Sequence, residues 1–516
     1  MGLQKTSWWN WRDRLPARVW LLLFFWLLVM VLLRGRAFED PGSLWHIRVG
    51  DWILSHGRIM QTDPFTFTFA GQPWRPQLWA GECIMSLLHR LGGFETLLLV
   101  FAVILASFAT WLSLRFIRAG LHPILAGGLV LAGLTVASFH FYVRPHMVTF
   151  IFIGLIMGWI VDFERGRILP RRWLWLIPIV IFWTNLHGGV LGGLATFGLA
   201  VAGWSLFAFL KRESPIRSWR DSLFLVGILA LSGLAMLVNP YGAAMLKSWF
   251  SIIDSKVVPQ MVTEHLPLRL SDLNGQAVVA FGVFYLVMLA GTLPSWPRVS
   301  WLLPLVWFAL SLHSIRHGPL FCAAALVALA DMLPSTIWFS WLQKHGETLV
   351  RTPAPQDKVT WRTFALPALL IAICLGLQTA RIHVPVIGSG WVQLDPKEVA
   401  VDLLEPLQKY ARQRPDGTPI FNDANFGGLL IYYTPNLRVF MDDRCELYGD
   451  PWMADYMQFM EYHPERIEDY RARYGFDRAL VTSGSPMDQY LRKSSRWVEV
   501  SRGQAAVLYA TRPDGE

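Results

Sequence analysis

Long apolar runs separated by short polar loops are the feature that most limits how this chain can fold. A helix needs about 20 residues to cross a ~30 Å hydrocarbon layer, and several of these runs reach that length. Only 16% of the residues are charged, whereas soluble domains usually carry about a quarter. We therefore predict an α-helical polytopic membrane protein with about eleven transmembrane helices. The predicted spans lie near residues 17–33, 95–114, 123–142, 146–162, 173–186, 189–210, 222–238, 277–292, 300–313, 318–334 and 363–380.

The first apolar run, Val19–Leu33, follows Lys5, Arg12, Arg14 and Arg18 and so imitates a signal peptide. The run is longer than the apolar core of a typical signal peptide, and no small-residue cleavage site follows it. We interpret it as an uncleaved first span.

Lysine and arginine are distributed unevenly between the two sets of loops, and an excess of them is typical of the cytoplasmic side. The short loops of one set contain only Arg144 and Arg316. The other set contains the N-terminus and Arg115, Arg118, Arg165, Arg167, Arg171, Arg172, Lys211, Arg212, Arg217, Arg220, Arg298, Lys344, Arg351, Lys358 and Arg362. We therefore expect a cytoplasmic N-terminus and, after an odd number of spans, an extracytoplasmic C-terminal domain.

Two long segments fall on the outer side of this topology. Residues 34–94 form the first outer loop, in which we expect two interfacial helices, Pro41–Leu54 and Leu78–Leu91. The second segment, residues 239–276, opens with the turn sequence Asn239-Pro240-Tyr241-Gly242.

Strand-like and helix-like stretches alternate after the last span, which favours a small soluble α/β domain in the form of a sandwich. We divide the chain into a transmembrane domain, residues 1–384, and an extracytoplasmic α/β domain, residues 385–516. The predicted elements of the second domain are helices at 399–412, 451–474 and 487–491 and strands at 418–421, 438–441, 478–481 and 505–509.

Several other classes of protein fit the sequence less well. The net charge of +9 forms no continuous basic stripe, so we do not expect a nucleic-acid partner. The four cysteines lack the spacing of a zinc site, although a Cys83–Cys445 bond is conceivable. The glycine pairs lack the pattern of a phosphate loop, and Asp442-Asp443-Arg444 favours a turn over a sugar-nucleotide motif, because we place it outside the cytoplasm.

Polar residues suited to chemistry gather on the predicted outer side, and charged groups near a bilayer need a reason to be there. They are Asp40, His46, Asp63, Arg144, His146, Asn185, His187, Asn239, His313, Arg316 and His317. Each also has a purely structural interpretation. Asp40-Pro41 is typical of a helix start, Asp63-Pro64 of a turn, and an arginine such as Arg144 of an interface anchor. Their common location on the predicted outer side of the membrane favours a functional role.

Several outer-side motifs occur together in this chain. They are Asp40-Pro41-Gly42-Ser43-Leu44-Trp45-His46, Gly50-Asp51-Trp52-Ile53-Leu54, Asp63-Pro64-Phe65-Thr66-Phe67-Thr68, Gly71-Gln72-Pro73-Trp74, Asn185-Leu186-His187-Gly188-Gly189, Asn239-Pro240-Tyr241-Gly242, Arg316-His317-Gly318-Pro319-Leu320-Phe321, Phe421-Asn422-Asp423 and Asp442-Asp443-Arg444. With this combination the chain resembles a group of polytopic bacterial membrane proteins related to the GT-C glycosyltransferases. Protein O-mannosyltransferases and the lipid A aminoarabinose transferase are members of that superfamily.

The resemblance implies a GT-C-like fold in the bacterial inner (plasma) membrane. It also implies transfer of a sugar from a polyprenyl-phosphate donor to a lipid, glycan or protein acceptor at the outer face. In this family an acid of the first outer loop is a catalytic base or a metal-linked residue, a role that falls on Asp40, with a divalent cation as a candidate cofactor. The resemblance also leads us to expect acids where Gly42 and Leu78 stand. Glu82 or Asp63 would then have to supply the second acid.

The residues support such a reaction chemically. A carboxylate within hydrogen-bond reach activates an acceptor hydroxyl, and cationic side chains stabilise the leaving phosphate. We assign the base to Asp40. The candidate phosphate-binding and donor-binding residues are Arg144, Arg316, His317, His46 and His187. The lipid tail would then lie in a groove between spans, and the C-terminal domain would bind or cover the acceptor.

Two alternatives from other classes remain open at this point. The first is a non-catalytic membrane scaffold or assembly factor whose outer domain binds a partner, and the glycine and leucine at the expected acidic positions favour it. The second is a transporter. The sequence disfavours it, because no span carries an acid or base in its middle.

Overall fold

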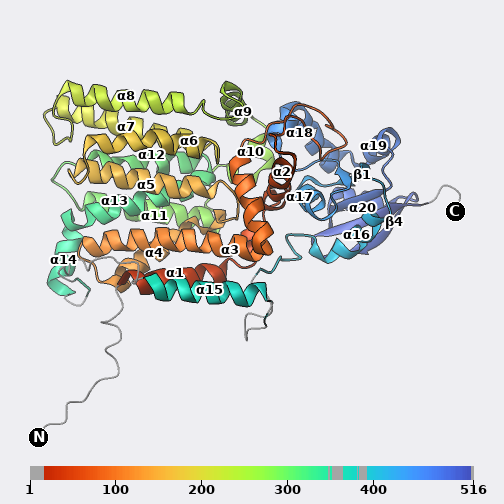
Figure 1. The fold of residues 1–516 in the computed structure, drawn as a ribbon, viewed down its shortest axis with the longest axis horizontal. Coiled ribbons are helices and arrows are strands. Elements are labelled where there is room, and N and C mark those ends of the chain that lie inside the picture. The colour runs from red at the N-terminus through yellow and green to blue at the C-terminus, as the bar shows by residue number, and fades with distance from the viewer. Residues whose placement is uncertain (1–16, 347–348, 351–363, 381, 383–391, 513–516) are drawn as a thin grey trace, which may run out of the picture.

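The computed structural model describes residues 17–346, 349–350, 364–380, 382 and 392–512, and it has two parts. Figure 1 shows long helices running side by side in a bundle and a smaller domain with a sheet at one end of that bundle. We call this end the domain-facing end and the other the far end. The predicted boundary between residues 384 and 385 lies outside the described residues.

A helix occupies each of the eleven predicted spans in this structure. They are α1 (Ala17–Leu32), α3 (Trp79–Arg118), α4 (Pro123–Ala137), α5 (Met147–Glu164), α6 (Leu176–Thr184), α7 (Val190–Phe209), α8 (Trp219–Ala235), α11 (Leu273–Ala290), α12 (Val299–His313), α13 (Gly318–Met332) and α15 (Ala365–Thr379). Among the described residues, six helical segments are long and apolar enough to cross a bilayer. They are Trp79–Arg118, Pro123–His140, Met147–Glu164, Val190–Phe209, Leu273–Ala290 and Ile315–Ser335. The chain is thus built as a membrane protein, and the number of eleven spans stays a prediction.

The first outer loop contains the two expected helices, and a break in helical geometry separates the second from the span that follows it. The first of them is α2 (Gly42–His56), and the second is the start of α3. A kink at Gly92 and Gly93 separates that start from the rest of α3. Gly93 has φ 68° and ψ −155°, a conformation open to glycine alone, so this residue permits the bend.

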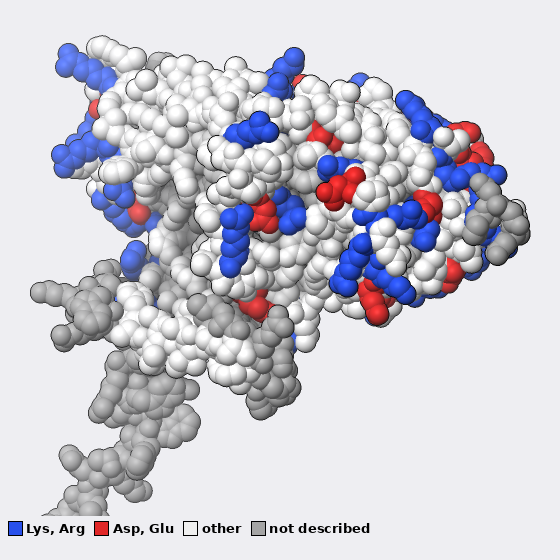
Figure 2. All heavy atoms as spheres, turned by 45° about the vertical axis from the view of Figure 1, so that its right-hand side comes forward, with Lys and Arg blue, Asp and Glu red and all other residues white. Residues whose placement is uncertain are grey.

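Ion pairs close the far end of the bundle. Arg165 Nε lies 2.9 Å from Asp331 Oδ1, and Arg115 Nη2 lies 3.0 Å from Asp162 Oδ1. Glu164 accepts hydrogen bonds from the Trp204 indole and the Val299 amide, at 3.1 and 3.0 Å. On the face shown in Figure 2, lysine and arginine side chains gather at this end, while the flank of the bundle is largely free of charge. Such an uncharged belt is the surface that lipid requires.

Shorter helices lie between the long ones, and they are α9 (Ala243–Ile253), α10 (Val258–Met261) and α14 (Ile337–His345). Figure 1 places α9 and α10 at the domain-facing end and α14 at the far end. Two short 3₁₀ turns also reach the domain-facing end, η5 (Thr263–His265) and η6 (Ile315–His317). Loops from both halves of the bundle therefore meet the C-terminal domain.

The C-terminal domain is an α/β fold around a sheet of five strands, within the described residues, in the order β2-β1-β3-β5-β4. The strands are β1 (Thr418–Asn422), β2 (Leu437–Val439), β3 (Arg478–Thr482), β4 (Trp497–Arg502) and β5 (Ala506–Thr511). The helices are α16 (Leu404–Arg412), α17 (Ala424–Tyr433), α18 (Cys445–Tyr462), α19 (Ile467–Tyr474) and α20 (Pro486–Lys493). β1 pairs in parallel with β2 and β3, whereas β5 is antiparallel to β3 and β4. The expected alternation is present, and α17 and β4 are additional to it.

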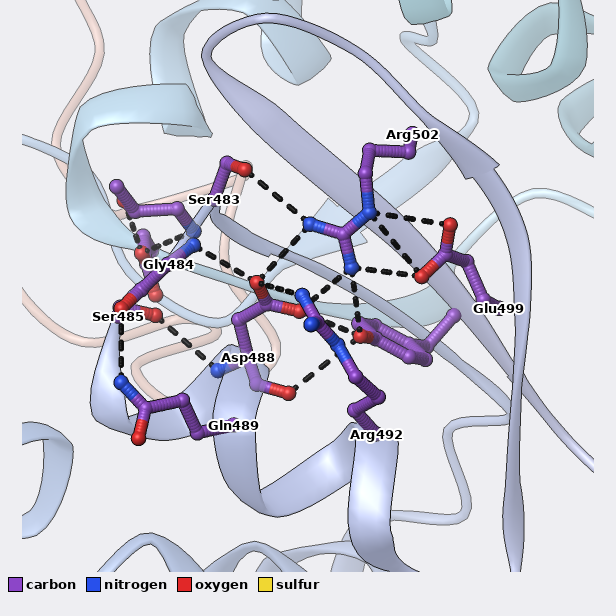
Figure 3. A network of polar contacts seen from close by, with 11 residues as sticks. Ser483, Gly484, Ser485, Asp488, Gln489, Arg492, Glu499 and Arg502 are labelled. Carbon is purple, nitrogen blue, oxygen red and sulfur yellow. Dashed lines mark hydrogen bonds and ion pairs between the residues drawn. The ribbon is translucent and has the colours of Figure 1, made fainter.

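A polar network centred on Asp488 holds one corner of this domain (Figure 3). The Asp488 carboxylate is buried and accepts from the Gly484 amide at 2.7 Å and from the Arg502 guanidinium at 3.1 Å. Arg502 also contacts Glu499 at 2.6 Å. Because its acids and arginines satisfy one another, we interpret this network as a structural clamp between the β3–α20 turn and the β4–β5 hairpin.

The first outer loop extends the sheet of the C-terminal domain. Thr66 forms a parallel bridge with Val439 of β2, and the amides and carbonyls of Phe65, Phe67 and Val439 exchange hydrogen bonds of 3.0 Å. Helix α17 packs on α2 so closely that a Cβ at Gly428 would lie 2.2 Å from the Pro41 carbonyl oxygen. The two parts of the chain are therefore joined by backbone pairing as well as by side chains.

All four cysteines are free. The Cys83–Cys445 bond that the sequence left conceivable does not form, and no disulfide joins the outer loop to the domain among the described residues.

Candidate active site

Asp40 and Arg144 form an ion pair at the domain-facing end. Arg144 Nη1 donates to both Asp40 oxygens, at 2.7 and 2.8 Å, and the Gly42 amide donates to Asp40 Oδ1 at 2.8 Å. The Asp40 side chain is 16% exposed and that of Arg144 22%, so solvent reaches the pair. Burial opposes the charge of Arg144, but Asp40 and Asp443 outweigh it and raise the pKa of Arg144. Arg144 therefore keeps its positive charge.

Arg144 fills the space beside Gly42. A Cβ at Gly42 would lie 2.8 Å from Arg144 Cζ and 2.9 Å from Asp40 Oδ1, closer than atoms pack. An acid at position 42, which the family resemblance led us to expect, would therefore displace Arg144 from its contact with Asp40. The site replaces an acid pair with an acid and an arginine.

This donor set does not fit a metal ion held by carboxylates. Both Asp40 oxygens already accept from Arg144, and position 42 has no side chain. Within the described residues, no group of three or more His, Cys, Asp or Glu side chains is arranged to hold a metal. The side chains present are therefore those of an acid and cations that act without a carboxylate-bound metal.

Glu82 contacts His46 and makes no contact with Asp40 among those that the structure shows. Glu82 Oε1 is 2.9 Å from His46 Nδ1, and both side chains are 1% exposed. Glu82 Oε2 and His46 Nε2 are buried and have no hydrogen-bond partner among the described residues. Burial, and then the charge of Arg144, hold the pKa of His46 well below its usual range, so the imidazole is neutral. The residue before α3 is Leu78 and not an acid, so Glu82 is the acid in the first turn of this helix.

Asp63 lies in a buried turn away from Asp40. Its carboxylate accepts from the Phe65 and Thr66 amides at 3.1 and 3.0 Å and pairs with Arg444 Nη1 at 2.8 Å. This carboxylate is fully buried and satisfied. The geometry favours the structural interpretation of Asp63 over the role of a second catalytic acid.

A second polar group lies next to the ion pair and contains residues that the sequence did not single out. His140 Nδ1 is 2.9 Å from Glu264 Oε2, and the neighbouring Arg316 donates to His265. Burial would raise the pKa of Glu264, but His140 and then the charges of Arg316 and Arg144 lower it well below its usual range. Glu264 is therefore an anion that interacts electrostatically with both arginines.

Histidines connect this group to the turn between α6 and α7. The His140 and His146 rings are 4.4 Å apart, and those of His146 and His187 are 6.3 Å apart. The Gly189 amide donates to His187 Nδ1 at 3.0 Å, so a neutral ring carries its proton on Nε2. Burial, and then Arg316, lower the pKa of His187 to about 3, which keeps the ring neutral. His187 thus presents an N–H donor to the site.

Among the predicted site residues, His317 has the weakest connection to these polar groups. Its ring lies 5.9 Å from that of Trp307, and its Nδ1 is buried without a hydrogen-bond partner among the described residues. The structure thus brings together Asp40, Arg144, His187 and Arg316, and it places the His46–Glu82 pair beside them. No sequence signal identifies His140, Glu264 or His265, because they lie in short turns that only the fold brings to this end.

The C-terminal domain contributes Asp443 to the same region. Trp45 of α2 donates its indole N–H to Asp443 Oδ1 at 2.5 Å. Burial raises the pKa of Asp443 to about 7, while Arg144 lowers it and Asp40 raises it further. Because the charges of Arg144 and Asp40 both act on it, Asp443 lies near that pair. The sequence placed this residue in a turn and in one of the outer-side motifs, without a role of its own.

Arg444 anchors this part of the domain. Its guanidinium contacts Asp63 at 2.8 Å and Asp442 at 2.6 Å, and all three side chains are fully buried. It also lies over the Trp74 ring, with 4.4 Å from Cζ to the ring centroid. A sugar-nucleotide role for this motif is thereby disfavoured, because Asp442 and Arg444 satisfy each other inside the protein.

A crevice of about 10 Å³ lies beside Asp40, between the first outer loop and the domain. It is lined on one side by residues 38–41 and 44 and on the other by Glu398, Val399, Asn425, Phe426 and Leu429. This volume admits about one water molecule. An acceptor must therefore part the loop and the domain to reach Asp40 through this crevice.

Comparisons with known proteins support the fold. No protein-family model and no curated protein sequence matches the chain. Among solved structures, the oligosaccharyltransferase of Archaeoglobus fulgidus, tethered to an acceptor peptide, is similar over 90% of this chain and 69% of its own, with TM-score 0.50 and 12% identity. The arabinofuranosyltransferase AftD from mycobacteria is similar over 97% of this chain, with TM-score 0.51 and 13% identity, and this chain covers 42% of it.

A third similar structure is ArnT from Cupriavidus metallidurans bound to undecaprenyl phosphate, with TM-score 0.39 and 13% identity over 96% of this chain and 98% of its own. At such low identities the comparisons speak for the fold alone. The chain resembles the GT-C glycosyltransferases in that fold, as its outer-side motifs indicated.

Proposed function

We propose that this protein is a membrane glycosyltransferase that moves a sugar from a polyprenyl-phosphate donor to an acceptor at the domain-facing end of the bundle. The GT-C-like fold supports the general kind of reaction, and the donor and acceptor belong to the proposal. The observation that carries it is the pairing of Asp40 with Arg144 beside a second arginine, Arg316, on loops far apart in the sequence. A base and cations for a leaving phosphate are what this reaction needs.

Asp40 is the base in this proposal. The acceptor hydroxyl oxygen attacks the anomeric carbon of the sugar, and the bond from that carbon to the phosphate oxygen breaks. The hydroxyl proton passes to the Asp40 carboxylate, and the lipid phosphate leaves with the electron pair of the broken bond. The Gly42 amide and Arg144 both donate to Oδ1, whereas Oδ2 accepts from Arg144 alone and takes the acceptor proton once Arg144 shifts towards the phosphate.

Arg144 binds the departing phosphate. It contacts Asp40 through Nη1 alone, and its Nε is buried without a hydrogen-bond partner among the described residues. A guanidinium has five N–H donors in a fork that matches phosphate oxygens, so Arg144 can bind a phosphate while it still contacts Asp40. As charge grows on the phosphate, the arginine shifts towards it and Asp40 becomes a stronger base.

The second polar group completes the anion site. Arg316 supplies a further guanidinium, and His187 supplies the N–H donor on Nε2. Glu264 offsets part of the positive charge, which keeps the phosphate from being held too tightly to leave. His46, held by Glu82 behind the Asp40–Arg144 pair, has a supporting role.

We place this end of the bundle outside the cytoplasm of a bacterium, in the inner (plasma) membrane, with the N-terminus inside. The far end carries the basic loops, among them Arg115, Arg165 and Arg298, which the positive-inside rule assigns to the cytoplasm. Polyprenyl-phosphate sugars at the outer leaflet would then meet the site. The lipid tail would lie along the apolar flank of the bundle.

The alternative is a non-catalytic scaffold, and the narrow crevice together with the close docking of the domain favours it. A scaffold would bind its partner through the outer domain without turning over a donor. The two functions differ in one measurable property, which is release of the lipid phosphate.

The test is turnover of polyprenyl-phosphate-linked sugars by the purified protein in nanodiscs, with membrane extract as the source of acceptors. We expect release of polyprenyl phosphate by the wild type and a loss of about 10²–10⁴-fold in Asp40→Asn, the usual effect of removing a general base. Asp455→Asn is the matched control, because that acid pairs with Arg466 on the exposed surface of the domain. Equal turnover by wild type and Asp40→Asn would refute the assignment, and no turnover by any variant would favour the scaffold.

A further inference from the structure

Asp443 lies beyond the carboxyl end of a strand of the C-terminal domain. It follows β2, at the edge where the parallel strands β1 and β2 end together. The Asn422 side chain bonds the Met441 carbonyl and the Phe440 amide, at 2.7 and 2.8 Å, and so holds the two strand ends side by side. Here that edge faces the Asp40–Arg144 pair.

The contacts of Asp443 connect it to the site across the interface between the two parts of the chain. Trp45, which donates to Asp443 Oδ1 at 2.5 Å, belongs to the same helix start as Asp40. The Asp443 side chain is partly exposed, whereas its neighbours Asp442 and Arg444 are fully buried. Among these three consecutive residues, Asp443 is therefore the one that solvent and substrate reach.

Rigid supports hold Asp443 in this position. Arg444, the next residue, is clamped between Asp442 and Asp63. Trp74 adds a hydrogen bond of 3.0 Å to Glu446. Asp443 thus cannot leave the site unless the domain separates from the first outer loop.

We propose that Asp443 is the second acid of this site and that it takes up a proton when the phosphate of the lipid donor binds Arg144. This rests on the proposed function. With Asp443 ionised, Asp40, Arg144 and Asp443 carry a net charge of −1, which repels a phosphate. With Asp443 protonated the net charge of the three is zero. The C-terminal domain thereby supplies the acid that Gly42 does not, as a positioning residue that acts through Arg144.

The charges around Asp443 decide the direction of the pH effect. Asp40 and Asp442 face it as anions, Arg144 faces it as a cation, and Trp45 donates a hydrogen bond to it. Burial, as the largest influence, raises the pKa of Asp443 to about 7. Asp443 is therefore protonated below that pH and ionised above it. Phosphate affinity should be highest below about pH 7 and fall as the pH rises, by up to about tenfold per pH unit for one linked proton.

The experiment measures binding of undecaprenyl phosphate to the purified full-length protein in nanodiscs between pH 5.5 and 8.5. Asp443→Asn keeps an oxygen that accepts from Trp45 but cannot ionise, so it should lack the additional fall in affinity that the wild type shows above about pH 7. Asp455→Asn should follow the wild type. The phosphate itself titrates near pH ~6, and comparing variants at each pH removes that contribution.

Trp45→Phe gives an independent readout. The lost indole hydrogen bond stabilised the ionised acid, so the midpoint of the affinity change should move to a higher pH. Parallel profiles for wild type and Asp443→Asn would overturn the proposal, as would a loss of binding by Asp443→Asn at every pH while the protein stays folded. Absence of binding by the wild type at all pH values would instead refute the lipid-phosphate donor, and so the proposed function itself.

Discussion

Replacing Arg444 by methionine should detach the C-terminal domain from the first outer loop. Arg444 contacts Asp63 at 2.8 Å and Asp442 at 2.6 Å, and all three side chains are fully buried. Methionine removes the cation and leaves two carboxylates in an apolar interface. The crevice beside Asp40 and the position of Asp443 both depend on this interface.

The size of the effect follows from the burial of the three groups. Removing one partner of a buried ion pair destabilises a protein by about 3–5 kcal/mol, because the remaining charge is left uncompensated. By contrast, Arg466 pairs with Asp455 at 2.9 Å on an exposed surface, and such pairs contribute about 0–1 kcal/mol. Arg466→Met is therefore a matched control with the same change of side chain.

Pulse proteolysis in increasing urea, with the protein in nanodiscs, measures the free energy of unfolding that exposes the C-terminal domain to cleavage. We expect Arg444→Met to lower it by about 3–5 kcal/mol and Arg466→Met by less than about 1 kcal/mol. Adding Asp63→Asn and Asp442→Asn to Arg444→Met should recover part of the loss, since no charge is then buried alone. An effect of Arg444→Met no larger than that of the surface control would refute this account of the interface.

Three further changes follow from the geometry. Gly42→Ala should displace the Arg144 guanidinium, whose Cζ would lie 2.8 Å from the new Cβ. Losing one charge-assisted hydrogen bond to the phosphate, about 1.5–3 kcal/mol, would weaken binding roughly 10- to 150-fold, which a titration with undecaprenyl phosphate measures. Unchanged binding would show that Arg144 does not hold the ligand. Gly93→Ala should destabilise the kink of α3 by about 1–3 kcal/mol through its positive φ alone, since nothing crowds its Cβ, and thermal unfolding that matches the wild type would contradict this. Glu264→Gln should tighten phosphate binding at neutral pH, because it removes an anion next to Arg316, and weaker binding would count against the charge argument.

The helical part of this fold is visible in the sequence because its cause is local. Each apolar run must satisfy its own backbone groups in lipid, which only a helix does, so the runs and helices coincide. Helix length alone does not fix the number of crossings, since α6 (Leu176–Thr184) has only nine residues. The sequence separated the interfacial helix Leu78–Leu91 from the span 95–114, and the structure breaks the helical backbone between them, at Gly92 and Gly93.

The elements of the C-terminal domain that escaped prediction depend on distant contacts. Helix α17 contains Gly427 and Gly428, which disfavour a helix locally. A Cβ at Gly427 would lie 2.5 Å from the Met441 carbonyl oxygen, so close packing is what requires these glycines. Strand β4 has one buried residue, Trp497, and its exposed remainder lacks the alternation that marks a strand.

The candidate site was predictable only in part, for a related reason. Sorting the loops by charge put Asp40 and Arg144 on one side, and the structure brings them into contact across 104 positions of sequence. The roles of Glu264 and Asp443 could not be read from the sequence, because nothing local shows which turn reaches which arginine. The expectation of Asp63 as a second acid did not foresee its burial under Arg444, which only the docked domain provides.

The central claim is that a lipid phosphate binds Arg144 at the domain-facing end, next to Asp40. An experimental structure of the full-length protein in nanodiscs with undecaprenyl phosphate tests it directly. The account predicts the phosphate within hydrogen-bond distance of the Arg144 guanidinium, on the side of Arg316. Phosphate density bound elsewhere, with the Asp40–Arg144 pair closed and unchanged, would contradict it.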